Sequence, residues 1–253
     1  LKLEFFATPG TFALIQTVVC RVCSVYRLLR YFLELAYDGT DYHGWQIQKN
    51  AHSVQAEIQN ALSTLLRQPT EILGSGRTDA GVHAIQQFAH FDTDQALGET
   101  DFVKKLNGIL PPSISIARLI PVTPDAHTRF DATQRHYIYR INREKTPFLR
   151  NFSYYNFHKL DVTQMNKAGE ILLNHQDFQC FSKVHTDVNH YLCNISEAMW
   201  KEETYYNTKL LVFYIGANRF LRGMVRAIVG TLLNVGNGKI GLEEFEQIIL
   251  SKD

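Results

Sequence analysis

The order of hydrophobic and polar residues in the first half of the chain predicts four strands and two helices. Alternating aliphatic and aromatic side chains predict strands over residues 30–37, 71–73, 85–91 and 114–120. Ser53 is a favourable N-cap for a helix that ends before Pro69, with an apolar face of Val54, Ile58, Ala61, Leu62 and Leu65. A second helix is predicted from Thr100 to Gly108. This order of elements is typical of a split β-α-β, ferredoxin-like unit.

The pattern restarts after Pro124 and predicts a related second half. Strands are predicted over residues 136–141, 195–201 and 209–215, and helices over 161–173, 218–233 and 242–250. The chain is therefore expected to be an α+β protein with two halves, residues 30–124 and 125–253. Residues 1–29 fit neither half, and we expect them to be a disordered or loosely helical extension without a catalytic part.

Composition indicates a globular protein that acts outside membranes. The chain has 253 residues, of which 45% are hydrophobic and 20% charged, so it can build a sizeable core. Its apolar runs are too short to span a membrane. Cys20 and Cys23 have the spacing of a half zinc site, but no second Cys-x-x-Cys pair completes it. The cysteines predict neither a metal site nor a disulfide framework, which fits the cytoplasm.

The distribution of charge is more informative than its sum. A formal net charge of +1 gives little attraction for nucleic acid as a whole. Residues 126–150, however, contain six basic and two acidic side chains, and residues 216–226 contain three arginines and no acid. These segments either line a groove for phosphate groups or form solvated faces.

Residues 74–84, Gly-Ser-Gly-Arg-Thr-Asp-Ala-Gly-Val-His-Ala, have a composition that core packing does not explain. Three glycines surround Arg77, Thr78 and Asp79 between two predicted strands, which favours a loop that presents side chains. A dinucleotide-binding fingerprint is excluded because Asp79 stands where it needs a glycine. Arg77 and Asp79 form either an active-site pair or a structural ion pair of a turn. For His83 we expect only a structural hydrogen bond.

This motif resembles the signature of the tRNA pseudouridine synthase A family, in which the aspartate is catalytic. Asp79 is the matching residue. The resemblance extends over residues 30–250 and includes four further stretches: Leu33–Gln46 with its Tyr-Asp-Gly-Thr and Gly-Trp-Gln runs, Leu106–Pro111, Arg135–Tyr139 and Phe220–Arg226.

The resemblance implies a fold, a reaction and a set of site residues. Two ferredoxin-like halves with antiparallel sheets would join around a central cleft, and uridine at tRNA positions 38, 39 and 40 in the anticodon stem-loop would be flipped out and isomerised. Arg77, Tyr137 and Arg226 would contact the substrate, with the Tyr137 ring stacked on uracil. Phosphate contacts are expected from the basic segments, at Arg129, Arg140, Arg143, Arg219 and Arg222. The family needs neither metal nor cofactor, and it suggests a homodimer.

Two other functions remain open from the sequence, and one feature departs from the family. The chain could be an RNA-binding module without turnover, or a hydrolase of nucleosides or glycosides that depends on one aspartate. Glycosidases usually need a second placed carboxylate, which the motif lacks. Relatives continue past the last predicted helix with another strand, whereas this chain stops at Asp253, so we expect the second half to lack that strand.

Overall fold

The computed structural model describes residues 3–9, 28–183, 189–205 and 207–252. The chain divides into two compact units, Phe5–Thr133 and Gln134–Asp253, the second with a few residues from the chain start. The described residues include five α-helices and nine strands, namely β1 and two sets of four, so the predicted α+β class is confirmed.

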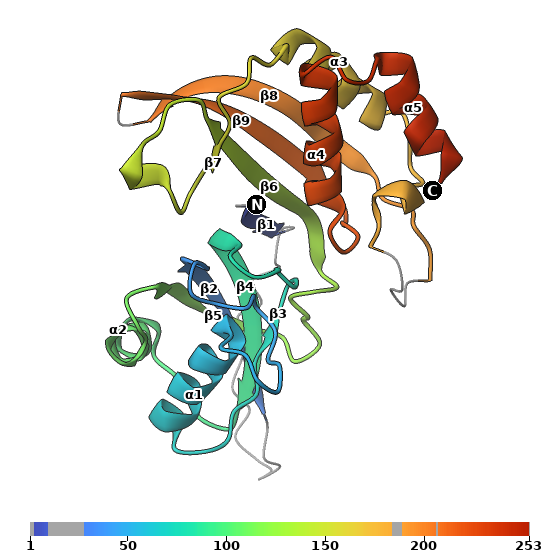
Figure 1. The fold of residues 1–253 in the computed structure, drawn as a ribbon. Helices are drawn as coiled ribbons and strands as arrows, with labels where there is room; N and C mark the ends of the chain where they lie inside the picture. Colours follow the sequence, from blue (N-terminus) through green and yellow to red (C-terminus); the bar gives the residue numbers. More distant parts are fainter. Residues whose placement is uncertain (1–2, 10–27, 184–188, 206, 253) are drawn as a thin grey trace. The chain divides into compact units, whose positions relative to one another are not determined.

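The first unit contains an antiparallel sheet in the order β5-β2-β4, with the short β3 paired to β4. Its strands are β2 (Leu29–Tyr37), β3 (Leu73–Gly74), β4 (His83–Thr93) and β5 (Ile114–Val122). Helices α1 (Val54–Leu66) and α2 (Glu99–Ile109) lie on one face of this sheet (Figure 1). Strand β3 ends at the start of the glycine-rich motif, and β4 begins at its end.

Helix α1 forms as its sequence predicts. The Ser53 side chain accepts a hydrogen bond from the Ala56 amide at 3.3 Å, which satisfies one of the unpaired donors of the first turn. The buried face differs in one position, because Leu66 is buried where Leu65 was predicted and Leu65 is only half-buried. Arg67 ends the helix in the left-handed conformation.

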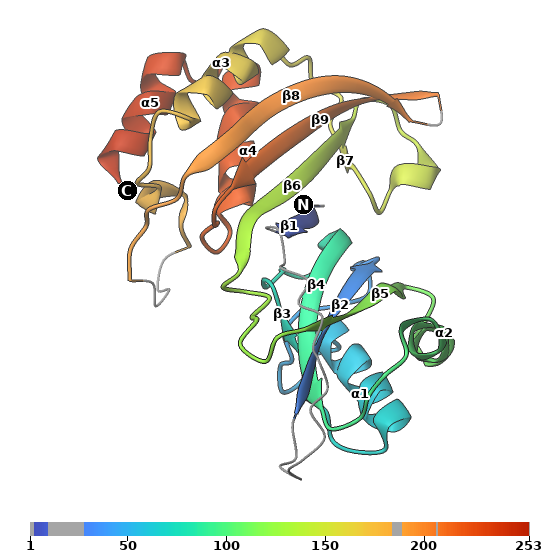
Figure 2. The same cartoon turned by 180° about the vertical axis from the view of Figure 1, so that it is seen from behind.

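The second unit has the strand order β7-β6-β9-β8, in which β6 and β7 are parallel and the other pairs antiparallel. The strands are β6 (Ala132–Asn142), β7 (Tyr154–Tyr155), β8 (Ile195–Tyr205) and β9 (Thr208–Ala217), and two short 3-10 helices are η1 (Pro147–Leu149) and η2 (Gln179–Phe181). Helix α3 (Val162–Leu172) packs on β8 and on α4 (Met224–Gly236), and α5 (Leu242–Ser251) packs on α3 and α4 (Figure 2). The buried core of this unit lies between these helices and the sheet.

Two predictions about local structure were wrong. The helix expected over residues 218–233 begins only at Met224, because Gly223 takes a left-handed conformation with φ of 75° and interrupts the backbone before it. Phe220 and Arg222 therefore lie on a loop and not on the helix. Strand β1 (Leu3–Pro9) replaces the disorder or loose helix expected for those residues, and residues 10–27 lie outside the described part of the chain.

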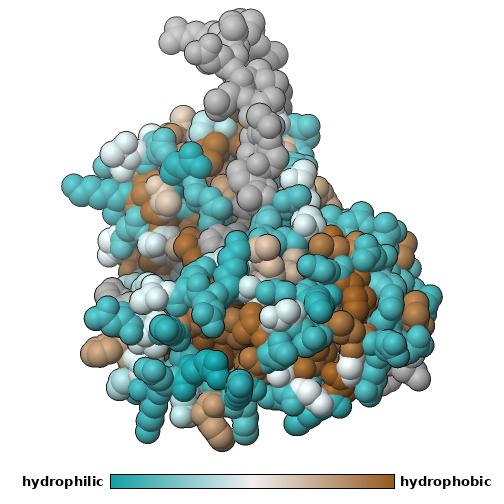
Figure 3. Space-filling model, turned by 90° about the horizontal axis from the view of Figure 1, so that it is seen from above, coloured by the Kyte–Doolittle hydropathy of each residue, from teal (hydrophilic) through white to brown (hydrophobic). Residues whose placement is uncertain are grey.

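Polar side chains cover most of the face shown in Figure 3, with hydrophobic patches between them. Among the residues that the structure describes, no helix is long and apolar enough to cross a membrane.

Candidate functional site

The motif loop, residues 75–82, connects β3 to β4 and presents two charged side chains. Its first residue is fixed to the neighbouring strand β4, because the Ser75 amide donates to the Phe88 carbonyl at 2.7 Å. Thr78 is buried, whereas Arg77 and Asp79 on either side of it are exposed. The loop thus turns one polar side chain inward and two charged side chains outward.

A buried polar network under the loop fixes its backbone near Asp79. The Tyr37 hydroxyl donates to Gln87 Oε1 at 3.0 Å, so it accepts from the Thr78 hydroxyl, which lies 2.8 Å away. The Gln87 amide nitrogen in turn donates to the Gly76 carbonyl at 3.3 Å. Tyr37 and Gln87 thereby hold the loop on both sides of Arg77. Sequence reasoning missed both, because the complete burial of Gln87, which requires a hydrogen-bonding partner, is visible only in the structure.

The segment after β2 holds the loop from a second direction. The Trp45 amide donates to the Thr78 carbonyl, and the Gly81 amide donates to the Tyr42 carbonyl, both at 3.2 Å. Gly44 has φ of 98°, and a Cβ atom there would overlap the Thr78 carbonyl oxygen. The glycine is therefore required by a close approach of two backbones. A Cβ atom at Gly74 would overlap the Trp45 ring.

His83 has the structural role that its position predicted. Its Nδ1 atom lies 2.9 Å from Asp38 Oδ1 and 3.2 Å from the Gly39 amide nitrogen, and the ring is buried. Burial alone would raise the pKa of the Asp38 carboxyl group, but hydrogen bonds from Thr40 and the nearby His83 ring bring that pKa below its usual value. This contact joins the start of β4 to the turn after β2.

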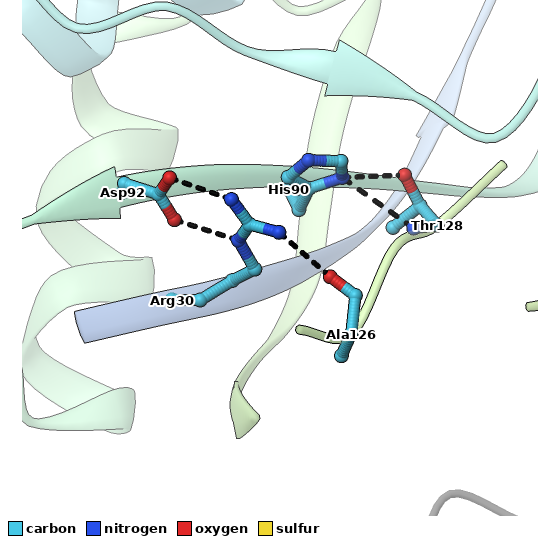
Figure 4. A network of polar contacts seen from close by, with 5 residues as sticks. All are labelled: Arg30, His90, Asp92, Ala126 and Thr128. Atoms are coloured by element: carbon cyan, nitrogen blue, oxygen red, sulfur yellow. Dashed lines mark hydrogen bonds and ion pairs between the residues drawn. The ribbon is translucent and has the colours of Figure 1, made fainter. Parts of the chain in front are cut away.

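A second polar network, shown in Figure 4, joins the start of β2 to the end of β4 and to the segment after β5. Arg30 donates two hydrogen bonds of 2.7 Å to the Asp92 carboxylate and one of 3.0 Å to the Ala126 carbonyl. The Arg30 hydrogen bonds hold the pKa of Asp92 below its usual value. His90 Nδ1 lies 2.8 Å from the Thr128 hydroxyl, and burial lowers the pKa of His90 to about 4. Thr128 also donates to the Leu73 carbonyl of β3, so the segment after β5 is fixed beside the motif.

Tyr137 and Arg226 belong to the second unit. The half-buried Tyr137 ring lies edge-on to Phe220, with ring centres 5.1 Å apart. Tyr139, two residues along β6, is buried. Burial and Tyr154 raise the Tyr139 pKa, while the positive charge of Arg226 lowers it. Arg226 is half-buried and lies in the first turn of α4. Its positive charge is close enough to act on the Tyr139 hydroxyl.

The remaining predicted arginines differ in exposure. Arg129, Arg143 and Arg222 are exposed, and Arg140 and Arg219 are half-buried. The Arg129 guanidinium carbon lies 5.9 Å from the centre of the Phe130 ring, and Arg219 Nη1 lies 3.2 Å from His190 Nε2. Arg77, Asp79 and Arg129 belong to the first unit; the other six predicted site residues belong to the second.

No group of acidic, histidine or cysteine side chains among the described residues could hold a metal ion. Cys180 and Cys193 are free thiols, and burial raises the pKa of each to about 11, so they are poor nucleophiles. Cys20 and Cys23 lie outside the described residues.

Comparison with known proteins gives one consistent result. A family model described as tRNA pseudouridine synthase matches residues 35–131 and 170–253. A tRNA pseudouridine synthase A of Bacteroides thetaiotaomicron is 52% identical over 88% of this chain and 83% of its own length. Proteins of the same name from Bacteroides fragilis and Porphyromonas gingivalis are 52% and 47% identical over 87% and 89% of this chain, covering 86% and 90% of their own lengths.

Among solved structures, a 3-hydroxy-3-methylglutaryl-coenzyme A reductase of Streptococcus pneumoniae aligns with 89% of this chain and 68% of its own. With a TM-score of 0.18 and 10% identity, this likeness carries no argument about fold or function.

Proposed function

The chain belongs to the tRNA pseudouridine synthase family, whose members isomerise uridine to pseudouridine in tRNA, and we propose that Asp79 is its catalytic residue. The proposed substrate is the anticodon stem-loop, with uridines 38, 39 and 40 as the targets. One observation carries the assignment of Asp79: its carboxylate is exposed on a loop whose neighbouring residues are fixed from below. Such a preformed loop can hold a carboxylate beside a glycosidic bond without reorganisation.

The reaction needs a carboxylate and no electron transfer. The bond between ribose C1′ and uracil N1 breaks, the base turns, and C1′ joins C5. N1 gains a proton, and the proton on C5 is lost to solvent. Asp79 either attacks a ribose carbon covalently or removes a proton from the sugar first, and both routes place its carboxylate at the ribose.

We propose substrate contacts for three further residues. A uridine in a stem must leave the base stack to reach a carboxylate, and Arg77 beside Asp79 can fill the space it leaves. Tyr137 is only half-buried, and its ring can stack on the detached uracil. Arg226 is close enough to Tyr139 to affect the pKa of Tyr139, and it supplies a positive charge near the Tyr139 ring.

The family resemblance extends the proposal to the assembly. It implies two ferredoxin-like halves around a cleft, a homodimer, and action on tRNA in the cytoplasm. Sedimentation of the full chain at several concentrations tests the dimer, because a mass that stays at one chain contradicts it.

The assay that tests the function is release of tritium from tRNA made with C5-tritiated uridine. The chain should release the label to water, and Asp79→Asn should release none while it still binds tRNA, because affinity comes mainly from phosphate contacts. Asp101→Asn, a change at an exposed aspartate on α2, is the matched control and should behave as the parent.

The outcomes separate the competing functions. Tight tRNA binding without tritium release by the parent chain would indicate a binding module, and release of free uracil would indicate a hydrolase. More than trace turnover by Asp79→Asn would remove Asp79 from the catalytic role.

Tyr137 is tested by two substitutions. Tyr137→Phe keeps the ring and should retain uridine binding, whereas Tyr137→Ala should raise KM and lower turnover because it removes a stack worth about 1–3 kcal/mol. Equal loss in both variants would show that the hydroxyl, and not the ring face, matters.

A further inference from the structure

The segment between β6 and α3 places exposed aromatic side chains among exposed basic ones. Phe157 and Phe148 are 67% and 84% exposed, and Tyr155 is 47% exposed. Residues 143–159 contain four lysines or arginines and one acidic residue, and Arg143, His158 and Lys159 are exposed. We call this the 143–159 surface. Exposed rings gathered in one place indicate an interaction site more than chance exposure.

The surface is held in place by the sheet. Strand β7 pairs with the end of β6, where Ile141 and Asn142 face Tyr154 and Tyr155. The Asn156 amide donates to the Asn142 carbonyl at 2.9 Å, and the buried Asn156 side chain accepts from the His158 amide at 3.0 Å. The rings therefore project from a fixed backbone, which lowers the entropy lost when a partner binds.

Three neighbouring rings form a short row. The centres of Tyr155 and Phe157 are 6.3 Å apart, and those of Phe157 and His158 are 4.2 Å apart. Arg143 is tied to this row, because its Nη2 atom donates to the His158 carbonyl at 3.5 Å. Aromatic faces beside positive charges match the bases and phosphates of an unpaired nucleic-acid strand. A protein partner whose surface carries no excess of acidic residues would leave the positive charge of the 143–159 surface unpaired.

The row begins close to the residues that the proposed function assigns to the uridine. Tyr154 and Arg226 both act on the hydroxyl of Tyr139, the first raising and the second lowering its pKa. Strand β7 and the start of α4 therefore lie within electrostatic reach of one tyrosine.

We propose that the 143–159 surface binds unpaired nucleotides of the RNA substrate, with a base stacked on Phe157 and phosphates on Arg143 and Lys159. The inference rests on the proposed function for the identity of the RNA. It goes beyond the arginines expected from the basic segments, because its central contact is an aromatic ring.

The test measures binding of unmodified tRNA transcript to the full chain carrying Asp79→Asn, so that no turnover interferes. Adding Phe157→Ala should weaken binding roughly 5- to 150-fold, the range that loss of one base stack gives. Phe157→Trp should restore it. Tyr205→Ala removes a ring that is 50% exposed at the last residue of β8, two strands away from β6, and should leave affinity unchanged. A blunt RNA duplex without unpaired nucleotides should bind the Phe157→Ala chain as well as its parent.

Other results would overturn the proposal. Unchanged tRNA affinity in Phe157→Ala, with a fall in the mass of the assembly by sedimentation, would make the surface an interface between two copies. Equal weakening for tRNA and duplex would show that no base is stacked. The melting temperature of Phe157→Ala should equal that of the parent, since the ring is exposed, which excludes misfolding as the cause. Absence of tritium release by the parent chain would count against the proposed function and leave the Phe157 result intact.

Discussion

The motif loop and the 143–159 surface are both fixed to strands of a sheet, but they differ in what is buried. Under the motif loop the polar groups of Tyr37, Thr78 and Gln87 are buried and hydrogen-bonded to one another. On the 143–159 surface the backbone is anchored through Asn142 and Asn156, while the aromatic rings are exposed. The motif loop holds the Asp79 carboxylate in a defined position, whereas the 143–159 surface exposes aromatic rings that a partner can contact.

This difference predicts two kinds of response to mutation. A change under the motif loop must disturb packing and hydrogen bonds together, so activity and stability should fall in parallel. A change on the 143–159 surface should weaken RNA binding while the melting temperature stays the same.

The largest effect is expected from Gly44→Ala. The left-handed φ of 98° and the overlap of the new Cβ with the Thr78 carbonyl require the backbone to move, at a cost of about 1–3 kcal/mol for the strained φ alone. The hydrogen bond from Trp45 to Thr78 should break, and tritium release should fall by more than tenfold. Denaturant unfolding and the tritium assay measure the two effects.

Gly108→Ala is the control for that change. A Cβ at Gly108 on α2 would meet no atom within 4 Å, and alanine is favoured over glycine within a helix by about 0.5–1 kcal/mol. Stability should rise slightly and turnover should not change. If Gly44→Ala behaved like Gly108→Ala, the close approach at the motif loop would have no functional importance.

A smaller effect is expected from Tyr37→Phe, which removes one hydroxyl and keeps the ring. It takes away the hydroxyl to which the buried side chains of Gln87 and Thr78 are hydrogen-bonded, at a cost of about 1–3 kcal/mol. Because the network positions the loop and does not touch RNA, kcat should fall while KM for tRNA changes little. Tyr42→Phe, which removes a hydrogen bond to Ser113 away from Thr78, should lower stability without this change in kcat. A rise in KM alone would contradict a positioning role for Tyr37.

These two regions also show which features the sequence could predict. The strand at residues 30–37 and the Ser53 cap were predicted because their signals are local, and the motif was found because its glycines and charges do not suit a core. The Tyr37–Gln87 contact joins residues 50 positions apart, and each looks like an ordinary strand residue. Strand β7 has only two residues, too few for alternation to be recognised. The start of α4 was placed wrongly because a left-handed Gly223, and not hydrophobic periodicity, sets it.

Titration of His90 should give a moderate effect, confined to the unit of the motif loop. Its pKa of about 4 lies below the usual 6.5, so as pH falls the unfolded chain takes up the proton first. The His90 contribution is present above pH 6.5 and is lost between pH 6.5 and 4, with a slope of at most about 1.4 kcal/mol per pH unit. His90→Asn keeps a hydrogen-bonding partner for the Thr128 hydroxyl and does not titrate, so its free energy of unfolding should fall less steeply over that range. Parallel curves for the two chains would contradict the burial of a neutral His90.

The smallest effects are expected from single arginines that bind phosphate groups. Replacing Arg140, Arg143, Arg219 or Arg222 by glutamine should reduce the slope of log affinity against log salt by about 0.7–0.9 for each phosphate group that is no longer neutralised. Binding of all tRNA substrates should weaken about equally, because phosphate contacts carry no base information.

Arg129, beside Phe130 in the other unit, should respond in the same way. Arg226 should differ, since a half-buried residue near Tyr139 should affect turnover and leave the slope unchanged. Unchanged slopes for the glutamine variants of all five arginines would mean that these side chains are only solvated, and that the RNA binds elsewhere.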